Sequence, residues 1–128
     1  MPTLFTKIIN GEIPCHKIAE SDKFLAFLDI MPLSKGHTLV IPKVEIDYIF
    51  DLDDDLLGEM IVFAKNVAKN IKNAVPCKKI GLAIVGLEVP HAHIHLIPIN
   101  AVSDMDFGKA KLNLSQEELM EIAEKIRS

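Results

Sequence analysis

Three of the chain's five histidines, His91, His93 and His95, fall on alternate positions of one short run. The residues that alternate with them are apolar. Because a β-strand points successive side chains to opposite faces, the run predicts a strand over residues 91–99. One face of that strand carries three imidazoles, and the other carries an apolar stripe suited to a core.

The residues of this run leave three interpretations open. The histidines can form the solvated face of an edge strand, a zinc site with water as a further ligand, or a phosphate site. Side chains two positions apart on a strand are separated by ~7 Å, so two imidazoles converge on one ion more easily than three. Phosphate chemistry suits the row, because one imidazole can attack phosphorus while its neighbours hydrogen-bond the phosphate oxygens.

Length and composition predict one globular domain over residues 1–128, with 49% apolar and 25% charged residues. We expect no membrane span, because no apolar run approaches ~20 residues. The N-terminus lacks the layout of a secretory signal. The isolated cysteines, Cys15 and Cys77, fit reduced thiols rather than a metal site. We therefore expect a cytoplasmic protein.

Charge argues against a nucleic acid as the main partner. The formal net charge is −4, and the fourteen basic residues are scattered rather than clustered, whereas binding to a nucleic-acid backbone needs a basic patch. A small anionic substrate is compatible with this balance, since a local pocket can be positive in an acidic protein.

Periodicity and turn signals predict an α+β chain. Strands are expected at residues 16–20, 24–30, 37–42, 79–86 and 91–99. A short helical segment is expected at residues 3–9, a long helix at 53–74 and a last helix from the capping box at Ser115 to about Arg127. The polar stretch 100–114 is expected to wrap over the surface beside the histidines. Strands in succession with helices to one side favour α+β over an alternating parallel sheet.

Three sequence blocks resemble the histidine triad (HIT) hydrolases and transferases. The triad and the apolar residues after it match at 91–97, an upstream block matches at 27–43, and an opening block matches at 5–14. Their order and spacing cover about residues 3–99. The triad by itself is moderately specific, and the three blocks together are highly specific.

The resemblance implies a HIT-like fold, with a five-stranded antiparallel sheet, one long helix and one C-terminal helix per subunit of a homodimer. It implies a purine nucleotide, of the AMP or GMP type, with its α-phosphate over the triad and no cofactor. The implied activity is that of a phosphoramidase, hydrolase or nucleotidyl transferase, acting on phosphorus–nitrogen or phosphoanhydride bonds through a covalent nucleotidyl-histidine. The alternatives are a nucleotide-binding protein with little turnover and a dinucleoside polyphosphate hydrolase.

The resemblance also assigns roles by position. His93 matches the nucleophile, His91 and His95 flank it, and His37 completes the phosphate site. Asp29 matches the family's ribose-binding carboxylate, and a strand-end turn residue is the alternative reading. The expected nucleotide-binding set also includes Phe5, Ile8, Phe27 and Ile30 as walls of the base pocket, and Glu88. Plain core packing is the alternative for the four apolar residues.

Two departures from the family pattern affect these expectations. Some members carry Cys-x-x-Cys and a later histidine that bind structural zinc, and here those positions are Thr3, Thr6 and Glu45. We therefore expect no metal. The phosphoramidase branch has Gly-Gln-Ser-Val before its triad, whereas this chain has Leu87 and Glu88 in place of the glutamine and serine. Leucine cannot donate to phosphate and glutamate repels it, so the leaving group is left open.

Overall fold

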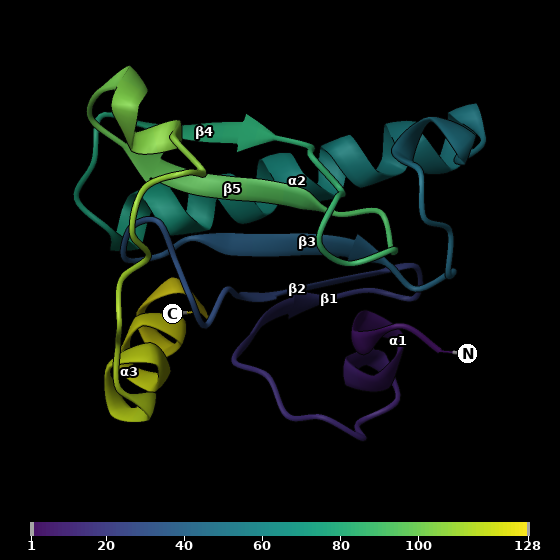
Figure 1. The fold of residues 1–128 in the computed structure, drawn as a ribbon, viewed down its shortest axis with the longest axis horizontal. Helices are drawn as coiled ribbons and strands as arrows, with labels where there is room; N and C mark the ends of the chain where they lie inside the picture. Colours follow the sequence, from purple (N-terminus) through teal and green to yellow (C-terminus); the bar gives the residue numbers. More distant parts are fainter. Residues whose placement is uncertain (1, 128) are drawn as a thin grey trace.

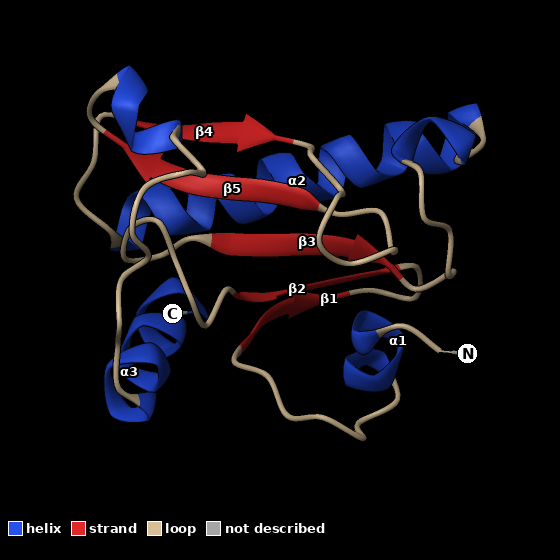
Figure 2. Cartoon of the chain, in the orientation of Figure 1, coloured by secondary structure: helices blue, strands red, loops and turns tan. Residues whose placement is uncertain are grey.

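The computed structural model describes residues 2–127, which form an antiparallel five-stranded sheet with helices on both faces (Figures 1 and 2). The strands are β1 (Lys17–Glu20), β2 (Phe24–Leu28), β3 (Thr38–Pro42), β4 (Lys79–Ala83) and β5 (Ile94–Ile99). The α-helices are α1 (Leu4–Ile9), α2 (Asp54–Ala74) and α3 (Gln116–Arg127), and the 3-10 turns are η1 (Ile49–Asp51) and η2 (Val102–Met105). The expected α+β class and antiparallel sheet are confirmed.

The strand order β1-β2-β3-β5-β4 places the triad strand inside the sheet, between β3 and β4. In the β3–β5 pair Leu39 lies opposite His95, and Thr38 lies opposite Leu96. Side chains opposite each other in such a pair share a face. This register brings His37, the residue before β3, beside His95, although the two are far apart in sequence.

The two faces of the sheet build two apolar clusters. Helices α2 and α3 cover one face, where the larger cluster includes Phe24, Val40 and Leu96. Helix α1 covers the other face through Phe5, which packs with Phe27 and Leu39. All five residues of β2 and of β3 are buried, because both faces of these strands are covered. The triad side chain His95 shares the α1 face with Leu39.

Helix α2 forms where the sequence predicts it. The side chain of Asp53 caps its first turn by accepting a hydrogen bond from the backbone N–H of Leu56 at 2.7 Å. Met60, Ala64, Val67 and Ile71 repeat at helical spacing and are almost completely buried against the sheet. Helix α3 likewise begins at the predicted capping box, where the Ser115 hydroxyl accepts from the N–H of Glu118 at 3.1 Å.

Several predicted strands are shorter in the structure, and the triad strand is one of them. It begins at Ile94 rather than at residue 91, because the backbone N–H of His91 donates to the Val89 carbonyl and that of Ala92 to the Ile46 carbonyl, outside the ladder. The predicted strand at 79–86 ends at Ala83, and that at 24–30 ends at Leu28. Two of the three triad histidines therefore precede the strand and are held by loop contacts.

Within residues 2–127, none of the helices combines the length and apolar character needed to cross a membrane.

Candidate active site

A cavity of about 210 Å³ opens on the α1 face of the sheet, next to the triad. Its walls are mainly apolar, and they also include two imidazoles and two carboxylates. The lining residues are Leu4, Phe5, Ile8, Ile13, Pro14, Cys15, Phe27, Leu28, Asp29, Ile30, Leu39, Glu88, Val89, His93 and His95. An apolar cavity with a few convergent polar groups is the usual form of a small-molecule site.

A larger open depression, of about 940 Å³, lies elsewhere on the surface between the β2–β3 sheet end and the start of α2. Carboxylates, among them Asp53, Asp54, Asp55 and Glu59, form much of its lining. Of the three matched blocks it contains only Lys43, the last residue of the upstream block, and none of the histidines. Since a carboxylate-lined surface repels phosphate, the smaller cavity beside the triad is the better candidate site.

The hydrogen bond of His93 fixes which of its nitrogens can react. Nδ1 lies 2.7 Å from the backbone carbonyl oxygen of His91. A carbonyl oxygen only accepts, so Nδ1 carries the proton in the neutral ring and the lone pair lies on Nε2. The ring lines the cavity and packs edge-on against Phe5, with centroids 5.1 Å apart. His93 therefore presents an oriented nitrogen lone pair at the cavity, the requirement for a nucleophile.

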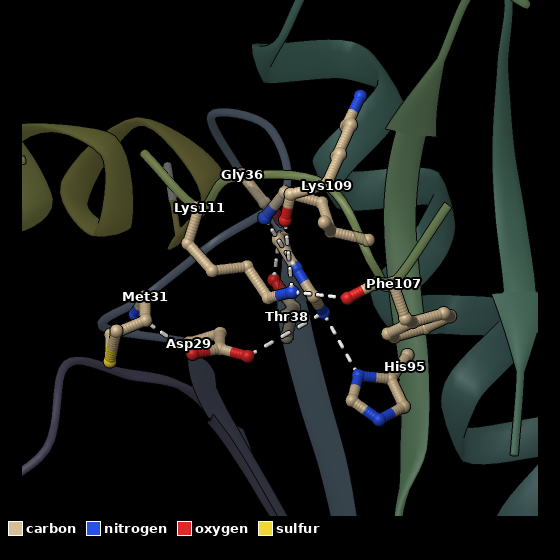
Figure 3. Close-up of polar contacts among 10 residues, drawn as sticks. Asp29, Met31, Gly36, Thr38, His95, Phe107, Lys109 and Lys111 are labelled. Atoms are coloured by element: carbon tan, nitrogen blue, oxygen red, sulfur yellow. Dashed lines mark hydrogen bonds and ion pairs between the residues drawn. The ribbon is translucent and has the colours of Figure 1, made fainter. Parts of the chain in front are cut away.

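The tautomers of His37 and His95 follow from a chain of hydrogen bonds. The backbone N–H of Leu33 donates to Nδ1 of His37 at 3.0 Å, so the His37 proton is on Nε2. That N–H donates to Nδ1 of His95 at 3.0 Å, which leaves the His95 proton on Nε2. Figure 3 shows the second ring nitrogen of His95 pointing away from this contact. His95 therefore has an N–H directed outward, able to bind a phosphate oxygen.

Burial keeps these two rings uncharged. Desolvation, with smaller repulsion from His95 and Lys111, lowers the pKa of His37 to about 3. Desolvation, followed by repulsion from His93 and Lys111, lowers the pKa of His95 to about 4. Both imidazoles are thus neutral at physiological pH, as the tautomer chain requires.

Asp29 lies at the end of β2, on the rim of the cavity (Figure 3). Its Oδ1 accepts a hydrogen bond from the Met31 N–H at 2.9 Å, so part of its role is that of a turn residue. Its Oδ2 lies 3.7 Å from Nε2 of His37, which is no ion pair because His37 is neutral. Burial raises the pKa of Asp29 despite the Met31 hydrogen bond. Among residues 2–127, Oδ2 thus makes no close hydrogen bond, and Asp29 lines the cavity.

His91 does not line the cavity, and instead holds the triad loop in place through buried hydrogen bonds. It is completely buried, and its Nε2–H donates to the Pro42 carbonyl at 2.8 Å. Its Nδ1 therefore accepts, and the hydroxyl of Thr3 donates to it at 2.8 Å. Desolvation lowers the pKa of His91, although the bond to Pro42 raises it. These contacts tie the triad loop to β3 and to the N-cap of α1.

The positions that carry zinc ligands in some family members do come together here. Thr6 donates its hydroxyl hydrogen to Glu45 at 2.6 Å, the N–H of Thr3 donates to the same carboxylate oxygen at 2.9 Å, and Thr3 reaches His91. Zinc prefers thiolate and imidazole nitrogen ligands, and the only imidazole nitrogen available already accepts from Thr3. The residues present do not fit structural zinc.

Asp29, His37 and His95 also place one potential ligand atom each within 4.8 Å of one another. A metal-binding histidine normally donates its other ring N–H to an acceptor. Nδ1 of His37 instead faces the N–H donor of Leu33, so metal binding through Nε2 would need a tautomer shift that leaves Leu33 unpaired. This cluster is better suited to hydrogen bonding than to a metal.

The four predicted walls of the base pocket all line the cavity. Phe5 and Phe27 are almost completely buried and pack edge-to-face with centroids 5.6 Å apart. Ile8 is partly buried, whereas Ile30 is 61% exposed at the rim. Phe5 and Phe27 thus also serve the core, and Ile30 has surface available for a ligand.

Leu87 and Glu88 lie in the loop before the triad, and only Glu88 lines the cavity. Glu88 is exposed, and its charge is one of the causes that raise the pKa of Asp29. Leu87 is 88% exposed. The anionic side chain therefore helps to line the same cavity as the imidazoles of His93 and His95.

Two residues beyond the matched blocks contact the site. The Phe107 ring packs edge-on against His95, with centroids 4.8 Å apart, and Lys111 lies beside Asp29 and His95 (Figure 3). The sequence indicated only that residues 100–114 start next to the triad, because nothing in their pattern marks a fold-back. Cys15 and Leu39 also line the cavity without a sequence signal for it.

A family model described as the HIT domain matches residues 10–102, well over half of the chain. An adenosine 5′-monophosphoramidase of Schizosaccharomyces pombe is 38% identical over 131 aligned positions, covering 100% of this chain and 98% of that protein.

Comparison with solved structures also finds proteins of similar fold. A HIT-like protein of Bartonella henselae involved in cell-cycle regulation superposes with a TM-score of 0.84 at 34% identity, covering 98% of this chain and 94% of that one. A hypothetical histidine triad nucleotide-binding protein of Sulfolobus tokodaii gives a TM-score of 0.82 at 32% identity, covering 96% of this chain and 88% of that one.

Proposed function

The chain belongs to the histidine triad (HIT) family, and we propose that it is an enzyme that cleaves or transfers the nucleotidyl group of a purine nucleotide, of the AMP or GMP type, through a covalent intermediate on His93. The observation that carries this proposal is the hydrogen bond from Nδ1 of His93 to the His91 carbonyl, which leaves Nε2 as the ring nitrogen that can react beside the cavity. A nucleophile held in the reactive tautomer avoids a reorganisation cost during reaction.

The proposed chemistry has two steps. Nε2 of His93 bonds to the α-phosphorus while the phosphorus–nitrogen or phosphoanhydride bond breaks, and the leaving group departs with the bonding pair and takes a proton from solvent. A water or another acceptor then attacks the same phosphorus, frees His93 and releases its proton to solvent. The outward N–H of His95 hydrogen-bonds a phosphate oxygen in both steps, where charge on that oxygen grows.

The cavity supports a nucleoside as the rest of the substrate. Its apolar walls, among them Phe5, Phe27 and Ile30, accept a flat base, and Oδ2 of Asp29 accepts from a ribose hydroxyl. The S. pombe relative is named for adenosine 5′-monophosphoramidase activity, and the S. tokodaii structure for nucleotide binding. Both names agree with the site's combination of apolar wall, carboxylate and imidazoles.

A substrate panel tests the proposal. Adenosine and guanosine phosphoramidates, dinucleoside polyphosphates and nucleotide sulfates are incubated with the protein, and released mononucleotide is measured. Rapid quenching and intact-mass analysis then look for the chain with one added nucleotidyl group. Turnover of at least one class with a trapped adduct is expected, and turnover without any adduct would contradict the covalent route.

The segment before the triad supports a second candidate, a nucleotide-binding protein with little turnover. Glu88 adds negative charge on the rim next to Asp29, and Leu87 offers no hydrogen bond to a leaving group. Tight binding of mononucleotide with no turnover across the panel would favour this candidate over the enzyme. Cleavage of dinucleoside polyphosphates alone would favour the third, a polyphosphate hydrolase.

A further inference from the structure

The segment after β5 folds back over the site and is fastened at both ends. At one end, the Asp104 carboxylate accepts from the backbone N–H groups of Asn100 and Ala101 at 2.7 and 2.9 Å. At the other end, the N–H of Leu112 donates to the Pro32 carbonyl at 2.8 Å, in the loop that follows Asp29. Residues 106–111 between these points lie against His95 through Phe107. Their position relative to the triad is therefore set by the fold.

Lys111 directs its side chain back into this loop (Figure 3). Its Nζ donates to the Phe107 carbonyl at 2.6 Å and, more weakly, to the Lys109 carbonyl at 3.4 Å. The side chain is partly buried. Within residues 2–127 these carbonyls are the partners of the ammonium group, and no carboxylate pairs with it. An ammonium group has three protons, so one remains for a further acceptor.

The charge of Lys111 acts on the phosphate-binding groups. It is among the causes that lower the pKa values of His37 and His95. Since the rings of His37 and His95 are neutral, Lys111 provides a full positive charge on this side of the site, where Asp29 and Glu88 provide negative charge. A phosphoryl group carries at least one negative charge, and neutral hydrogen-bond donors alone compensate it poorly.

We propose that Lys111 is a phosphate-binding residue of this site, whose ammonium group contacts a non-bridging oxygen of the α-phosphate held over His93 and His95. The inference rests on the proposed function for the identity of the ligand, and adds a cation from the segment after the triad. Lys111 is a partly buried cation held by two carbonyls, with one proton left for a further acceptor and, within residues 2–127, no carboxylate at ion-pair distance. Its charge is compensated more fully when the anion binds.

The competing role is purely structural, in which the ammonium group only fastens the loop at residues 107–111. The two roles differ in how they affect ligands with and without phosphate. Loss of a phosphate contact weakens nucleotide binding and leaves nucleoside binding unchanged. Loss of loop order weakens both alike, because it acts through Phe107 and the walls of the site.

The test compares AMP with adenosine by isothermal titration on the full-length protein. Lys111→Met, which removes the charge and keeps the length, should weaken AMP binding at least tenfold and change adenosine binding less than twofold. Lys111→Arg should recover most of the AMP affinity. Lys109→Met is the matched control, since that lysine pairs with Asp104 at 3.7 Å, and both affinities should stay within twofold.

AMP affinity within twofold of wild type in a folded Lys111→Met variant would overturn the proposal, and so would equal losses for AMP and adenosine. Lys111→Gln serves as a second variant if the methionine variant does not fold. Wild-type turnover on the substrate panel tests the enzymatic function separately. If the wild-type protein binds AMP but turns over no substrate, the enzymatic function is refuted, and the comparison of AMP with adenosine still decides the role of Lys111. If the wild-type protein binds no nucleoside monophosphate, both the enzymatic function and the role of Lys111 are refuted.

Discussion

His93 has one ring nitrogen committed to the His91 carbonyl and the other at the cavity, so its ring is the direct target for testing mechanism. His93→Ala should abolish turnover while nucleotide affinity stays within about tenfold, because the lost group acts mainly in the transition state. His93→Gly should regain some activity when imidazole is added, since the free ring can occupy the vacated space. Steady-state kinetics with parallel mononucleotide titration measure both effects, and full activity in His93→Ala would refute the assignment.

The buried histidines predict how stability depends on pH. Burial lowers the pKa of His37 to about 3, whereas in the unfolded chain it has its ordinary value near 6.5. Between these values the unfolded state binds more protons, so the free energy of unfolding is retained above pH ~6.5 and falls as the pH drops. One such histidine contributes a slope of up to about 1.4 kcal/mol per pH unit.

Urea unfolding at several pH values between about 4 and 7, at fixed protein concentration, measures that slope. His37→Gln removes one titrating ring, so its slope should be shallower than that of wild type whatever its absolute stability. Equal slopes in the two proteins would show that His37 becomes protonated without unfolding.

Among the elements, the turn before β3 depends on glycine. Gly36 has φ +96°, and an added Cβ would lie 3.0 Å from a methyl group of Val75 and 3.2 Å from the ring of Pro98. Gly36→Ala should therefore cost about 2 kcal/mol or more, through backbone strain and overpacking. Gly58→Ala, in α2 with open space around it, should stabilise by about 0.5–1 kcal/mol. Chemical denaturation of both variants gives the comparison, and a neutral Gly36→Ala would contradict the close approach.

At the scale of the whole molecule, exposed apolar side chains predict a two-fold dimer. Ile61 and Val62 on α2 are 41% and 58% exposed, and Leu82 on the edge strand β4 is 48% exposed. An apolar helix face beside an unpaired edge strand is a surface that a second copy can cover. Val62→Glu should shift sedimentation at micromolar concentration from dimer to monomer. Met120→Glu on α3, 50% exposed, is the control and should not. A wild-type monomer would refute the dimer.

The residues present also predict independence from metal. Thr3, Thr6 and Glu45 bond to one another and to His91 where a zinc site would need thiolate or free imidazole ligands. Turnover should survive prolonged chelation, and elemental analysis of purified protein should find well under one zinc per chain. Stoichiometric metal whose removal stops turnover would instead favour a metal-dependent hydrolase.

The sequence by itself determined the α+β class, the helices α2 and α3, and the family, because periodicity, capping residues and motif spacing are local properties. It also predicted the triad, His37 and Asp29 as residues of one site, through the resemblance rather than through geometry. The predicted triad strand was too long at its start, because the backbone partners of His91 and Ala92 lie in loops outside the sheet.

Only the tertiary structure decided which nitrogen of each histidine is free. Those assignments depend on Leu33, on the His91 carbonyl and on Thr3, and nothing in the sequence pattern marks their partners. It likewise decided that Phe107 and Lys111 reach His95, since the fold-back of their segment rests on hydrogen bonds to distant loops. Tautomers and charges in a buried site are set by contacts between segments remote in sequence, and such contacts exist only in the folded chain.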